Sequence, residues 1–403
     1  MDGGSASCDF LVIGAGVVGV TVSRELHRVY GGRVLVIEKE PSPGLHASGR
    51  NSGVLHAGVY YQPGSLKARL CVLGNRRMRS YCKEKGLPIN DSGKVIVARS
   101  QLDLCALDEL QRRARANGID AEMIDTQTLR EVEPSARTIE KALYVKDTAV
   151  VLPQTVMAAL LQDAQKEGVV FAFDCAWQGS DKVGLALTSR GLISYGHLVN
   201  CAGLFADRIA HEFGVGRHYR ILPFLGRFYQ LRPQSHVRVR GNIYPVPDLR
   251  NPFLGIHFTR RPNGEVTVGP SALPLLGREQ YSGMKGANAS DAFSMGKYML
   301  HLMTSNRDHF RSLALKELSK MTRKGFFREA AGLVEGLEPQ DLVPGTYAGI
   351  RAQLVNTQTA ELLNDFVVES GPDSTHILNA VSPAFTSSLP FAEHVVQTMK
   401  LKN

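Results

Sequence analysis

Residues Asp9–Glu40 constrain the fold more than any other part of this chain. A short apolar run, Phe10–Ile13, precedes the glycine turn G-A-G-V-V-G, and a segment with helical spacing follows the turn. A second apolar run, Val34–Ile37, ends at the acidic Glu38, 19 residues after the last glycine. This order of strand, glycine turn, helix, strand and acid is typical of a βαβ unit that binds a dinucleotide.

Each residue of this unit has a separate physical role. Gly14 permits the tight turn, Gly16 lets the backbone approach a pyrophosphate, and Gly19 lets the helix pack close to the strand. The N-terminus of the helix presents unpaired N–H groups and a partial positive charge to the phosphates. We expect Glu38 to accept hydrogen bonds from ribose hydroxyls. The alternative, a glycine-rich turn in another kind of α/β protein, explains fewer of these features.

The composition indicates a globular enzyme of two domains. The chain has 403 residues, of which 43% are hydrophobic and 21% charged. No apolar run is long enough to cross a bilayer, and the N-terminus MDGGSASCD lacks the basic and apolar regions of a secretory signal. We expect a cytoplasmic or a mitochondrial protein, and an organelle presequence would then be absent from this chain.

Cysteine spacing and net charge limit the partners. The six cysteines show no C-x-x-C spacing, so we expect reduced thiols and no metal site. The net charge is +9, with basic clusters at 112–115 and 316–328. Solvated helix faces are the first interpretation of these clusters, and attraction of an anionic substrate or peripheral contact with an acidic membrane is the alternative. No nucleic-acid motif accompanies the charge, so we expect no such partner.

The order of predicted elements indicates that the nucleotide-binding unit is discontinuous. A strand over 192–199 leads into N-C-A-G, and a helix start follows. Short strands between 228 and 270, with a hairpin turn over Arg261–Gly264, predict an antiparallel block. Residues 293–336 have mostly helical character. The C-terminal part is expected to hold two strands, a serine-rich turn over Ser382–Ser388 and a helix over 389–401.

With these elements in place, the chain resembles the FAD-dependent oxidoreductases of the D-amino-acid oxidase and glycerol-3-phosphate dehydrogenase superfamily. More narrowly, it is similar to the L-2-hydroxyglutarate dehydrogenase family. The segments that carry the resemblance are VIGAGVVG with VIEKE, HASGRNSGVLHAGVYYQPGSLKARLC, GKVIVA, NCAGLFADRIA, GNIYPVPD, PFLGIHFTRRPNGEVTVGPSA, AGIRAQ and NAVSPAFTSS. The resemblance implies an α/β fold in which a discontinuous Rossmann-like FAD-binding domain (1–90, 150–212 and 340–403) accompanies an α+β substrate domain with a mixed or antiparallel sheet (91–149 and 213–339).

The resemblance also implies which residues bind FAD. Val170 would contact the adenine through backbone atoms, and Ser382–Ser388 would precede a helix whose N-terminal amides face the flavin. His46 occupies a position similar to that of a histidine that some relatives link covalently to FAD, although we expect noncovalent binding here. The expected cofactor-binding residues are Gly14, Gly16, Gly19, Glu38, Lys39, His46, Ser48, Asn51, Ser52, Val170, Ala202, Gly203, Ser382 and Ser387.

Oxidation of a short 2-hydroxy acid requires a base for the hydroxyl proton and a cation for the carboxylate. His257 in G-I-H-F-T is the first candidate for the base, and His56 is the second. Arg351 is the candidate for the carboxylate, while Tyr61 and Tyr244 are weaker candidates. Each residue also has a purely structural alternative, such as a buried core histidine, an interdomain salt bridge or a packed tyrosine.

The implied reaction converts L-2-hydroxyglutarate to 2-oxoglutarate and passes electrons to a quinone or a carrier protein. Two departures from the family pattern keep the substrate open: Arg50 stands where a histidine is usual, and Leu225 stands where an arginine is usual. An amine or amino-acid oxidase is therefore the second hypothesis. The third is a flavin-binding assembly or regulatory protein without turnover, against which His257 and Arg351 weigh.

Overall fold

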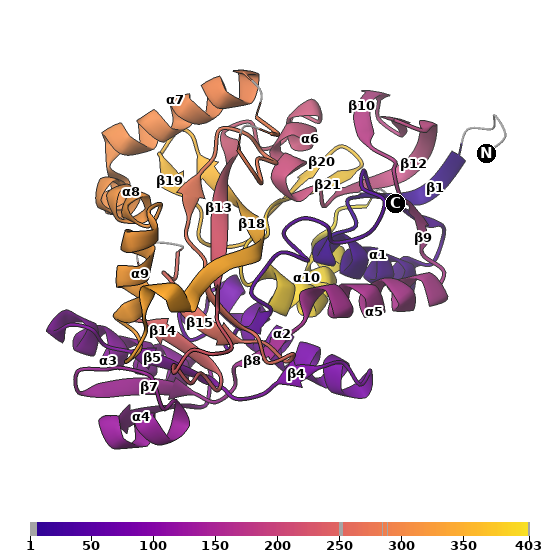
Figure 1. Cartoon of the computed structure of the whole chain (residues 1–403). Helices are drawn as coiled ribbons and strands as arrows, with labels where there is room; N and C mark the ends of the chain where they lie inside the picture. The colour runs from indigo at the N-terminus through magenta and orange to yellow at the C-terminus, as the bar shows by residue number, and fades with distance from the viewer. Residues whose placement is uncertain (1–5, 250–252, 284, 288, 402–403) are drawn as a thin grey trace.

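Two large β-sheets lie side by side, with helices on their outer faces (Figure 1). The computed structural model describes residues 6–401 except 250–252, 284 and 288, so the first five residues of the N-terminal segment lie outside it. This mixed α/β architecture, with one sheet built from distant parts of the chain, confirms the predicted fold class.

The first sheet has eight strands, and its centre is parallel. The parallel strands run in the order β9, β2, β1, β12 and β21. Their bounds are Val170–Ala172, Val34–Ile37, Ala6–Ile13, Gly191–Asn200 and Ser374–Asn379. Strands β10 (Trp177–Lys182) and β11 (Leu185–Thr188) extend one side in antiparallel pairing, and β20 (Val367–Gly371) pairs antiparallel with β21.

Both faces of the sheet are buried at its centre, which explains why β2 and the second half of β1 are continuously apolar. On β1, Val12 belongs to a hydrophobic cluster that includes Val20 of α1 (Val17–Tyr30) and Phe391 of α10 (Ala384–Thr398), whereas Leu11 belongs to a separate cluster with Ile209 of α6 (Ala206–Glu212). Successive side chains of a strand point to opposite faces, so the run F-L-V-I contributes to two cores.

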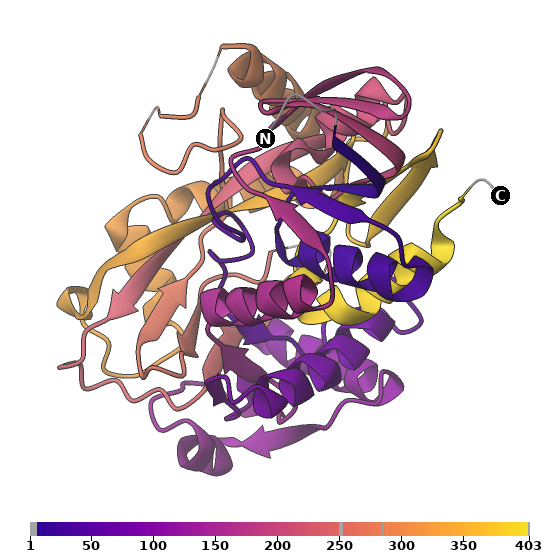
Figure 2. The same cartoon turned by 90° about the vertical axis from the view of Figure 1, so that its right-hand side faces the viewer.

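Four helices pack together on the face of this sheet to which Val12 points, and α10 lies between α1 and α2 (Figures 1 and 2). They are α1 (Val17–Tyr30), α2 (Leu66–Glu84), α5 (Pro153–Lys166) and α10 (Ala384–Thr398). The short α6 (Ala206–Glu212) follows β12. Helix α10 begins at Ala384 rather than at Leu389, so Ser387 and Ser388 lie inside the helix and not in the turn that precedes it.

The second sheet has ten strands and is mixed, as predicted. Its order is β19, β18, β13, β16, β15, β14, β5, β7 and β6, with β17 beside β13. Only the β14–β5 pair is parallel. The bounds are β5 Lys94–Val97, β6 Ala121–Asp125, β7 Lys141–Val145, β13 Tyr219–Leu231, β14 Asn242–Pro245, β15 His257–Arg260, β16 Val266–Gly269, β17 Leu273–Pro274, β18 Leu342–Asn356 and β19 Glu361–Leu362. Residues Arg261–Gly264 form the predicted hairpin turn between β15 and β16.

Strand β18 is a correction to the expected division of the chain. It pairs antiparallel with β13 along the length of both strands, so residues 342–356 belong to the ten-stranded sheet. They were expected within 340–403 of the FAD-binding part. We therefore propose that the last segment of that part begins after Asn356; the remaining boundaries stay predictions.

The other helices cover the outer side of the second sheet. Helices α3 (Gln101–Ala116) and α4 (Thr126–Val132) lie near β6 and β7, and α7 (Ala289–Ser305), α8 (Phe310–Ser319) and α9 (Arg323–Ala331) form the expected helical region (Figure 1). A small sheet of β3 (Val54–Leu55), β8 (Ala149–Val151) and β4 (Ile89–Asn90) completes the fold. Among the described helices, none is both long enough and apolar enough to span a membrane.

Candidate active site

A cavity of about 650 Å³ lies between the two sheets. The glycine turn after β1, Glu38 after β2 and the Cys201–Phe205 turn after β12 line one part of it. Strands β14, β15 and β18 contribute Tyr244, His257 and Arg351 to another part. The cavity therefore lies at the carboxyl ends of the parallel strands, where open α/β sheets bind their ligands.

The glycine turn has the geometry that the sequence predicts. Gly14 has a φ of +99°, and a Cβ there would lie 2.8 Å from the carbonyl oxygen of Cys201. A Cβ on Gly19 would lie only 1.9 Å from the carbonyl oxygen of Gly14, so Gly19 allows helix and strand to pack closely from behind the cavity wall. Gly16 lines the cavity, and a Cβ on it would face the Ser48 hydroxyl at 3.1 Å.

Glu38 is buried and held in a fixed position at one end of the cavity. Its carboxylate accepts hydrogen bonds from the backbone N–H of Ala15 at 2.7 Å and of Glu40 at 3.0 Å. Cys175 and Gln178, from the segment that follows β9, line the same end. A fixed carboxylate beside a glycine turn is suited to the ribose of an adenine nucleotide.

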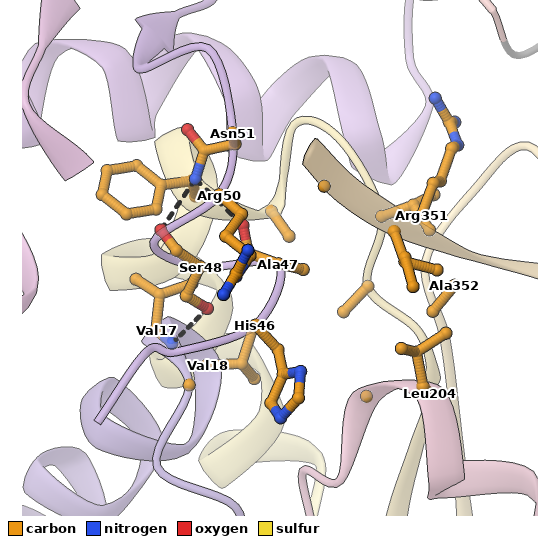
Figure 3. Close-up of a pocket in the computed structure, with 18 of the residues that line it drawn as sticks. Val17, Val18, His46, Ala47, Ser48, Arg50, Asn51, Leu204, Arg351 and Ala352 are labelled. Atoms are coloured by element: carbon orange, nitrogen blue, oxygen red, sulfur yellow. Dashed lines mark hydrogen bonds between the residues drawn. The ribbon is translucent and has the colours of Figure 1, made fainter. Parts of the chain in front are cut away.

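The segment from His46 to Ser52 forms another wall, opposite Arg351 and Ala352 (Figure 3). The Ser48 hydroxyl accepts the Val17 N–H at 2.9 Å and so satisfies one free amide of the first turn of α1. Asn51 donates to the carbonyls of Ala47 and Ser48 and accepts the N–H of Gly53, so its side chain shapes the loop. The Ser52 hydroxyl accepts the Val54 N–H at 3.4 Å.

His46 and Lys39 form a polar cluster at the edge of this segment. The two ring nitrogens of His46 lie 2.9 Å from Glu40 Oε1 and 2.8 Å from Tyr281 Oη. Lys39 Nζ lies 2.6 Å from Glu279 Oε1 and also pairs with Glu40. Among the described residues, Glu40, His46 and Glu279 are the only group with His and carboxylate atoms close enough together to hold a metal ion. The Lys39 ammonium already supplies a positive charge there.

Four residues expected to bind cofactor or substrate are not among the described residues of the cavity wall: Gly19, Tyr61, Val170 and Ser387. Val170 is 44% exposed because it begins β9, whereas ligands bind beyond the carboxyl end of such a strand. Ser387 is buried within α10, and Tyr61 lies behind the wall beside Lys67, whose Nζ is 5.5 Å from its ring. The other expected residues, including Ala202, Gly203 and Ser382, do line the cavity.

Both candidate histidines are buried and line the cavity. His257 Nδ1 lies 2.9 Å from the Gly255 carbonyl oxygen, so Nδ1 carries the proton and Nε2 is left with a lone pair and no hydrogen-bond partner among the described residues. Burial, and then the charge of Lys94, lower the pKa of His257 to about 3. Burial also holds the pKa of His56 well below its ordinary value, with Lys94, His257, Lys67 and Arg351 adding to the effect.

Arg351 projects from β18 into the same cavity. Its Nε donates to Gln353 Oε1 at 3.1 Å, and its guanidinium lies 5.2 Å from the centre of the Phe253 ring. Burial lowers the pKa of Arg351 to about 10, which still leaves it charged at neutral pH. Among the described residues, no carboxylate forms an ion pair with the Arg351 guanidinium, so it is suited to bind a substrate carboxylate through two parallel hydrogen bonds.

Lys94 and Lys67 lie near the cavity, although the sequence did not predict them as site residues. Both are buried close to this site, and burial lowers the pKa of each to about 7. The signal for Lys94 was a lysine inside the otherwise apolar strand G-K-V-I-V-A. Lys67 stands in a helix with ordinary amphipathic spacing, where a lysine gives no such signal.

The geometry fits FAD by its own features. The turn at Gly14 and Gly16 lets backbone approach a pyrophosphate, Glu38 is fixed for a ribose, and the cavity continues to the ten-stranded sheet, where an isoalloxazine ring would meet His257 and Arg351. Thr386 in the first turn of α10 also lines the cavity; its hydroxyl accepts the His56 N–H at 3.1 Å and so ties the helix to the candidate base.

Comparison with known proteins agrees with this reading of the cavity. The family model for FAD dependent oxidoreductase (DAO) matches residues 9–398. L-2-hydroxyglutarate dehydrogenase from Escherichia coli K12 is 34% identical over 397 residues, covering 97% of this chain and 93% of the relative. The mitochondrial L-2-hydroxyglutarate dehydrogenase from Caenorhabditis elegans is 36% identical, covering 96% and 92%.

Solved structures agree at the level of the fold. The dithionite-reduced L-α-glycerophosphate oxidase from Mycoplasma pneumoniae, with FAD bound, has a TM-score of 0.76 at 20% identity, covering 98% of this chain and 96% of that chain. The L-proline dehydrogenase from P. horikoshii has a TM-score of 0.71 at 16% identity, with coverage of 98% and 96%. The family model and the sequence relatives show that this chain belongs to the FAD-dependent oxidoreductases of the DAO family and, within them, to the L-2-hydroxyglutarate dehydrogenases.

Proposed function

We propose that this protein oxidises L-2-hydroxyglutarate to 2-oxoglutarate. The observation that carries the proposal is that Arg351, a half-buried cation, lines the same cavity as two buried histidines, His56 and His257. A 2-hydroxy acid presents a carboxylate for the first and a hydroxyl proton for the second. When bound, FAD supplies a flavin ring that accepts the hydride from the carbon that bears the hydroxyl.

Arg351 would bind the carboxylate next to the reacting carbon. Two N–H groups of a guanidinium match two carboxylate oxygens, which fixes the orientation of the substrate as well as its position. The contact with Phe253 and the hydrogen bond to Gln353 hold the side chain before the substrate arrives. Because the surrounding residues shield Arg351 partly from bulk water, this ion pair is stronger than it would be on the surface.

The base must reach a hydroxyl on the carbon beside that carboxylate. The charge of Arg351 contributes to lowering the pKa of His56, whereas it is not among the causes for His257. On this ground we assign the base to His56 and second place to His257. This reverses the order favoured by sequence. His56 Nε2 lies 3.4 Å from the Ser382 hydroxyl, and its Nδ1 has no described partner.

We propose that FAD is held without a covalent bond. Both ring nitrogens of His46 already lie within hydrogen-bonding distance of Glu40 and Tyr281, and attachment through either nitrogen would break one of these contacts. Gly14, Gly16, Ala202 and Gly203 would surround the phosphates and Glu38 the ribose. Acid precipitation should therefore release the yellow cofactor into the supernatant, and colour that stays with the precipitate would contradict noncovalent binding.

The amino-acid oxidase hypothesis has less support than the sequence suggested. Leu225 is buried in a hydrophobic cluster with Ile221 and Ile350 and is not part of the described cavity wall, so that departure does not alter the substrate pocket. Arg50 does line the cavity, but its Nε donates to the Leu45 carbonyl and its guanidinium lies 4.5 Å from the centre of the Tyr281 ring.

The reduced enzyme would pass its electrons to a quinone or to an electron-carrier protein. The relatives from C. elegans and mouse carry the word mitochondrial in their names, and we propose the mitochondrion or the cytoplasm as the compartment, with peripheral membrane contact as the route to a quinone.

The test of this function is anaerobic mixing of the yellow protein with candidate substrates. L-2-hydroxyglutarate should bleach the flavin absorbance, and D-2-hydroxyglutarate and L-lactate should not. Absence of bleaching with every hydroxy acid would overturn the proposal. Peroxide release with amino acids or N-methyl amines would support an oxidase instead.

A further inference from the structure

Lys94 is a buried ammonium without a hydrogen-bond partner. The residue is 1% exposed, and Nζ has no partner among the described residues. Two aromatic rings lie close to it: Nζ is 4.4 Å from the centre of the Tyr60 ring and 5.0 Å from the centre of the Tyr244 ring. Lysines are almost never fully buried unless they are paired, because an uncompensated charge is costly away from water.

The groups that face Lys94 from the neighbouring elements do not neutralise it. They are Tyr60 from the loop after β3, Tyr244 from β14, His257 from β15, His56 from the loop after β3, and Cys71 from α2. None is a carboxylate. Burial lowers the pKa of Lys94 to about 7 and raises the pKa of the Cys71 thiol to about 12, so the cysteine stays protonated at neutral pH. The described neighbours therefore supply no anion for the charged form of Lys94, and an anion that stabilises this form would have to come from outside the group.

The cavity offers a place for that anion. Lys94 is not itself among the residues of the described wall, but Tyr244 is, and the ring of Tyr244 stacks on His257 with centres 3.8 Å apart. The Tyr244 hydroxyl lies near Thr259 but makes no hydrogen bond of normal geometry among the described residues. An anion against the Tyr244 ring in this part of the cavity would be one aromatic ring away from the Lys94 charge.

A second cation, Arg351, comes from a different strand of the same sheet. Arg351 lies on β18 and Lys94 on β5, and four strands of the sheet order separate them. His56 is within electrostatic reach of both, because both charges contribute to lowering its pKa. A substrate with one carboxylate at Arg351 and its hydroxyl at His56 would have the part of the cavity lined by Tyr244 available for its far end.

We propose that Lys94 makes the cavity selective for 2-hydroxy acids that carry a second carboxylate at the far end of the chain. This inference rests on the proposed function and adds the residue that would distinguish a dicarboxylate from a monocarboxylate. Two unit charges about 7 Å apart at an effective dielectric constant of about 20 attract enough to change an affinity roughly 50-fold. Lys94 thus acts through space and through Tyr244, without contact with the reacting atoms.

The experiment compares two substrates of equal length. L-2-hydroxyvalerate has the five carbons of L-2-hydroxyglutarate, with a methyl group in place of the far carboxylate. For Lys94→Gln, the ratio of kcat/KM for L-2-hydroxyglutarate to that for L-2-hydroxyvalerate should fall roughly 10- to 100-fold from the wild-type ratio. Lys94→Arg keeps the charge and should keep most of the ratio. A Lys94→Gln ratio within about threefold of wild type would overturn the proposal.

A binding measurement separates this inference from the proposed function. Calorimetric titration of the oxidised, FAD-loaded protein with 2-oxoglutarate and with 2-oxovalerate needs no turnover. Lys94→Gln should weaken 2-oxoglutarate binding by the same factor and change 2-oxovalerate binding far less; equal weakening of both would show a structural role and contradict the proposal. If wild type is not bleached by any hydroxy acid, the proposed function fails, whereas bleaching with an unchanged Lys94→Gln ratio rejects Lys94 alone.

The pH dependence gives an independent readout. Lys94 is charged below its pKa, so the selectivity ratio of the wild type should be high at pH 6 and should fall as pH rises through about 7. Arginine stays charged throughout this range, so Lys94→Arg should hold its ratio to pH 9. A wild-type ratio that is equal at pH 6 and pH 9 contradicts selection by the Lys94 charge. Circular dichroism and FAD content confirm that each variant is folded.

Discussion

The two histidines of the cavity differ in what fixes their ring nitrogens. The Gly255 carbonyl holds His257 in one tautomer, while His56 has only a long contact with Ser382 and is anchored through its backbone N–H to Thr386. A base has to release its proton again after each turnover, and the contribution of the Arg351 charge to the lowered pKa of His56 supports the proposal that His56 is this base. Sequence motifs identify both residues but give no information on which lies nearer the cation.

We expect His56→Ala to lower kcat by about 10²- to 10⁴-fold, because a positioned base contributes that much to proton transfer. His257→Ala removes a ring that packs on Tyr244 and should have the smaller effect on kcat. Rapid-mixing measurement of flavin reduction, with FAD content as the control for folding, checks both. A larger loss with His257→Ala would return the base to His257.

The pH profile should show a base that stays active in mild acid. A histidine accepts a proton only in its neutral form, and the pKa of both histidines lies below the ordinary value of 6.5. As pH falls from 8, kcat/KM for flavin reduction by L-2-hydroxyvalerate, which has no second carboxylate for Lys94 to attract, should therefore stay level through 6.5 and decline only at lower pH. A decline centred at 6.5 would show that the base is a histidine in a more hydrated environment than this cavity.

Arg351 allows a sharper comparison, because lysine keeps the charge and loses the paired geometry. Arg351→Gln should lower kcat/KM for L-2-hydroxyglutarate by about 2–5 kcal/mol of transition-state stabilisation, which is roughly 30- to 5,000-fold. Arg351→Lys should lie between this variant and the wild type. If Arg351→Gln retains the wild-type kcat/KM, the carboxylate binds elsewhere.

At the scale of elements, local patterns predicted the βαβ unit, most helices and the hairpin between β15 and β16, because each has a sequence period or a turn signal of its own. They missed most of β18, where glycines interrupt the alternation and the partner strand, β13, lies far away in sequence. They also placed the start of α10 too late, because Pro390 looks like the first turn of a helix but lies inside this one. The same error moved Ser387 from a turn into the helix.

Helices α2 and α10 approach each other unusually closely at Gly74. A Cβ on Gly74 would lie 2.4 Å from the carbonyl oxygen of Thr386, the group that Pro390 cannot bond because it has no N–H. We expect Gly74→Ala to destabilise the protein by about 1–3 kcal/mol through overpacking and to disturb the neighbouring His56. Urea denaturation and flavin-reduction rates measure the two effects.

Gly296 provides the matched control, because it also lies in a helix, α7, but a Cβ there meets nothing within 4 Å. Gly296→Ala should leave flavin reduction unchanged and raise the free energy of unfolding by up to about 1 kcal/mol through helix propensity. Equal effects of the two substitutions would mean that the α2–α10 contact is looser than described.

At the scale of the whole molecule, residues from both sheets line the cavity, and the strands of the two sheets alternate along the chain. The family motifs predicted that a nucleotide-binding sheet and a mixed sheet would meet at a flavin, and the described walls come from both. Local sequence could not show which segment carries which wall: the segment after β9, with Cys175 and Gln178, lines the cavity rather than Val170, and Lys94 lies behind Tyr244. Both errors concern three-dimensional position, not residue type.

Because both sheets line the cavity, FAD should protect both from hydrogen exchange. Amides of β1 and β12 in the first sheet, and of β15 and β18 in the second, should exchange more slowly in the loaded protein than in the apoprotein. Mass spectrometry of peptides from these strands measures the difference. Protection confined to β1, β2 and β12 would show that the ring does not reach the ten-stranded sheet.

The position of β18 has a consequence for how new specificities arise in this architecture. Arg351, which is proposed to bind the substrate, belongs to the ten-stranded sheet. The glycine turn and Glu38, which are proposed to bind the coenzyme, follow strands of the eight-stranded sheet. Exchange of the mixed sheet between members of the family should therefore transfer substrate preference to a recipient that keeps its own affinity for the coenzyme.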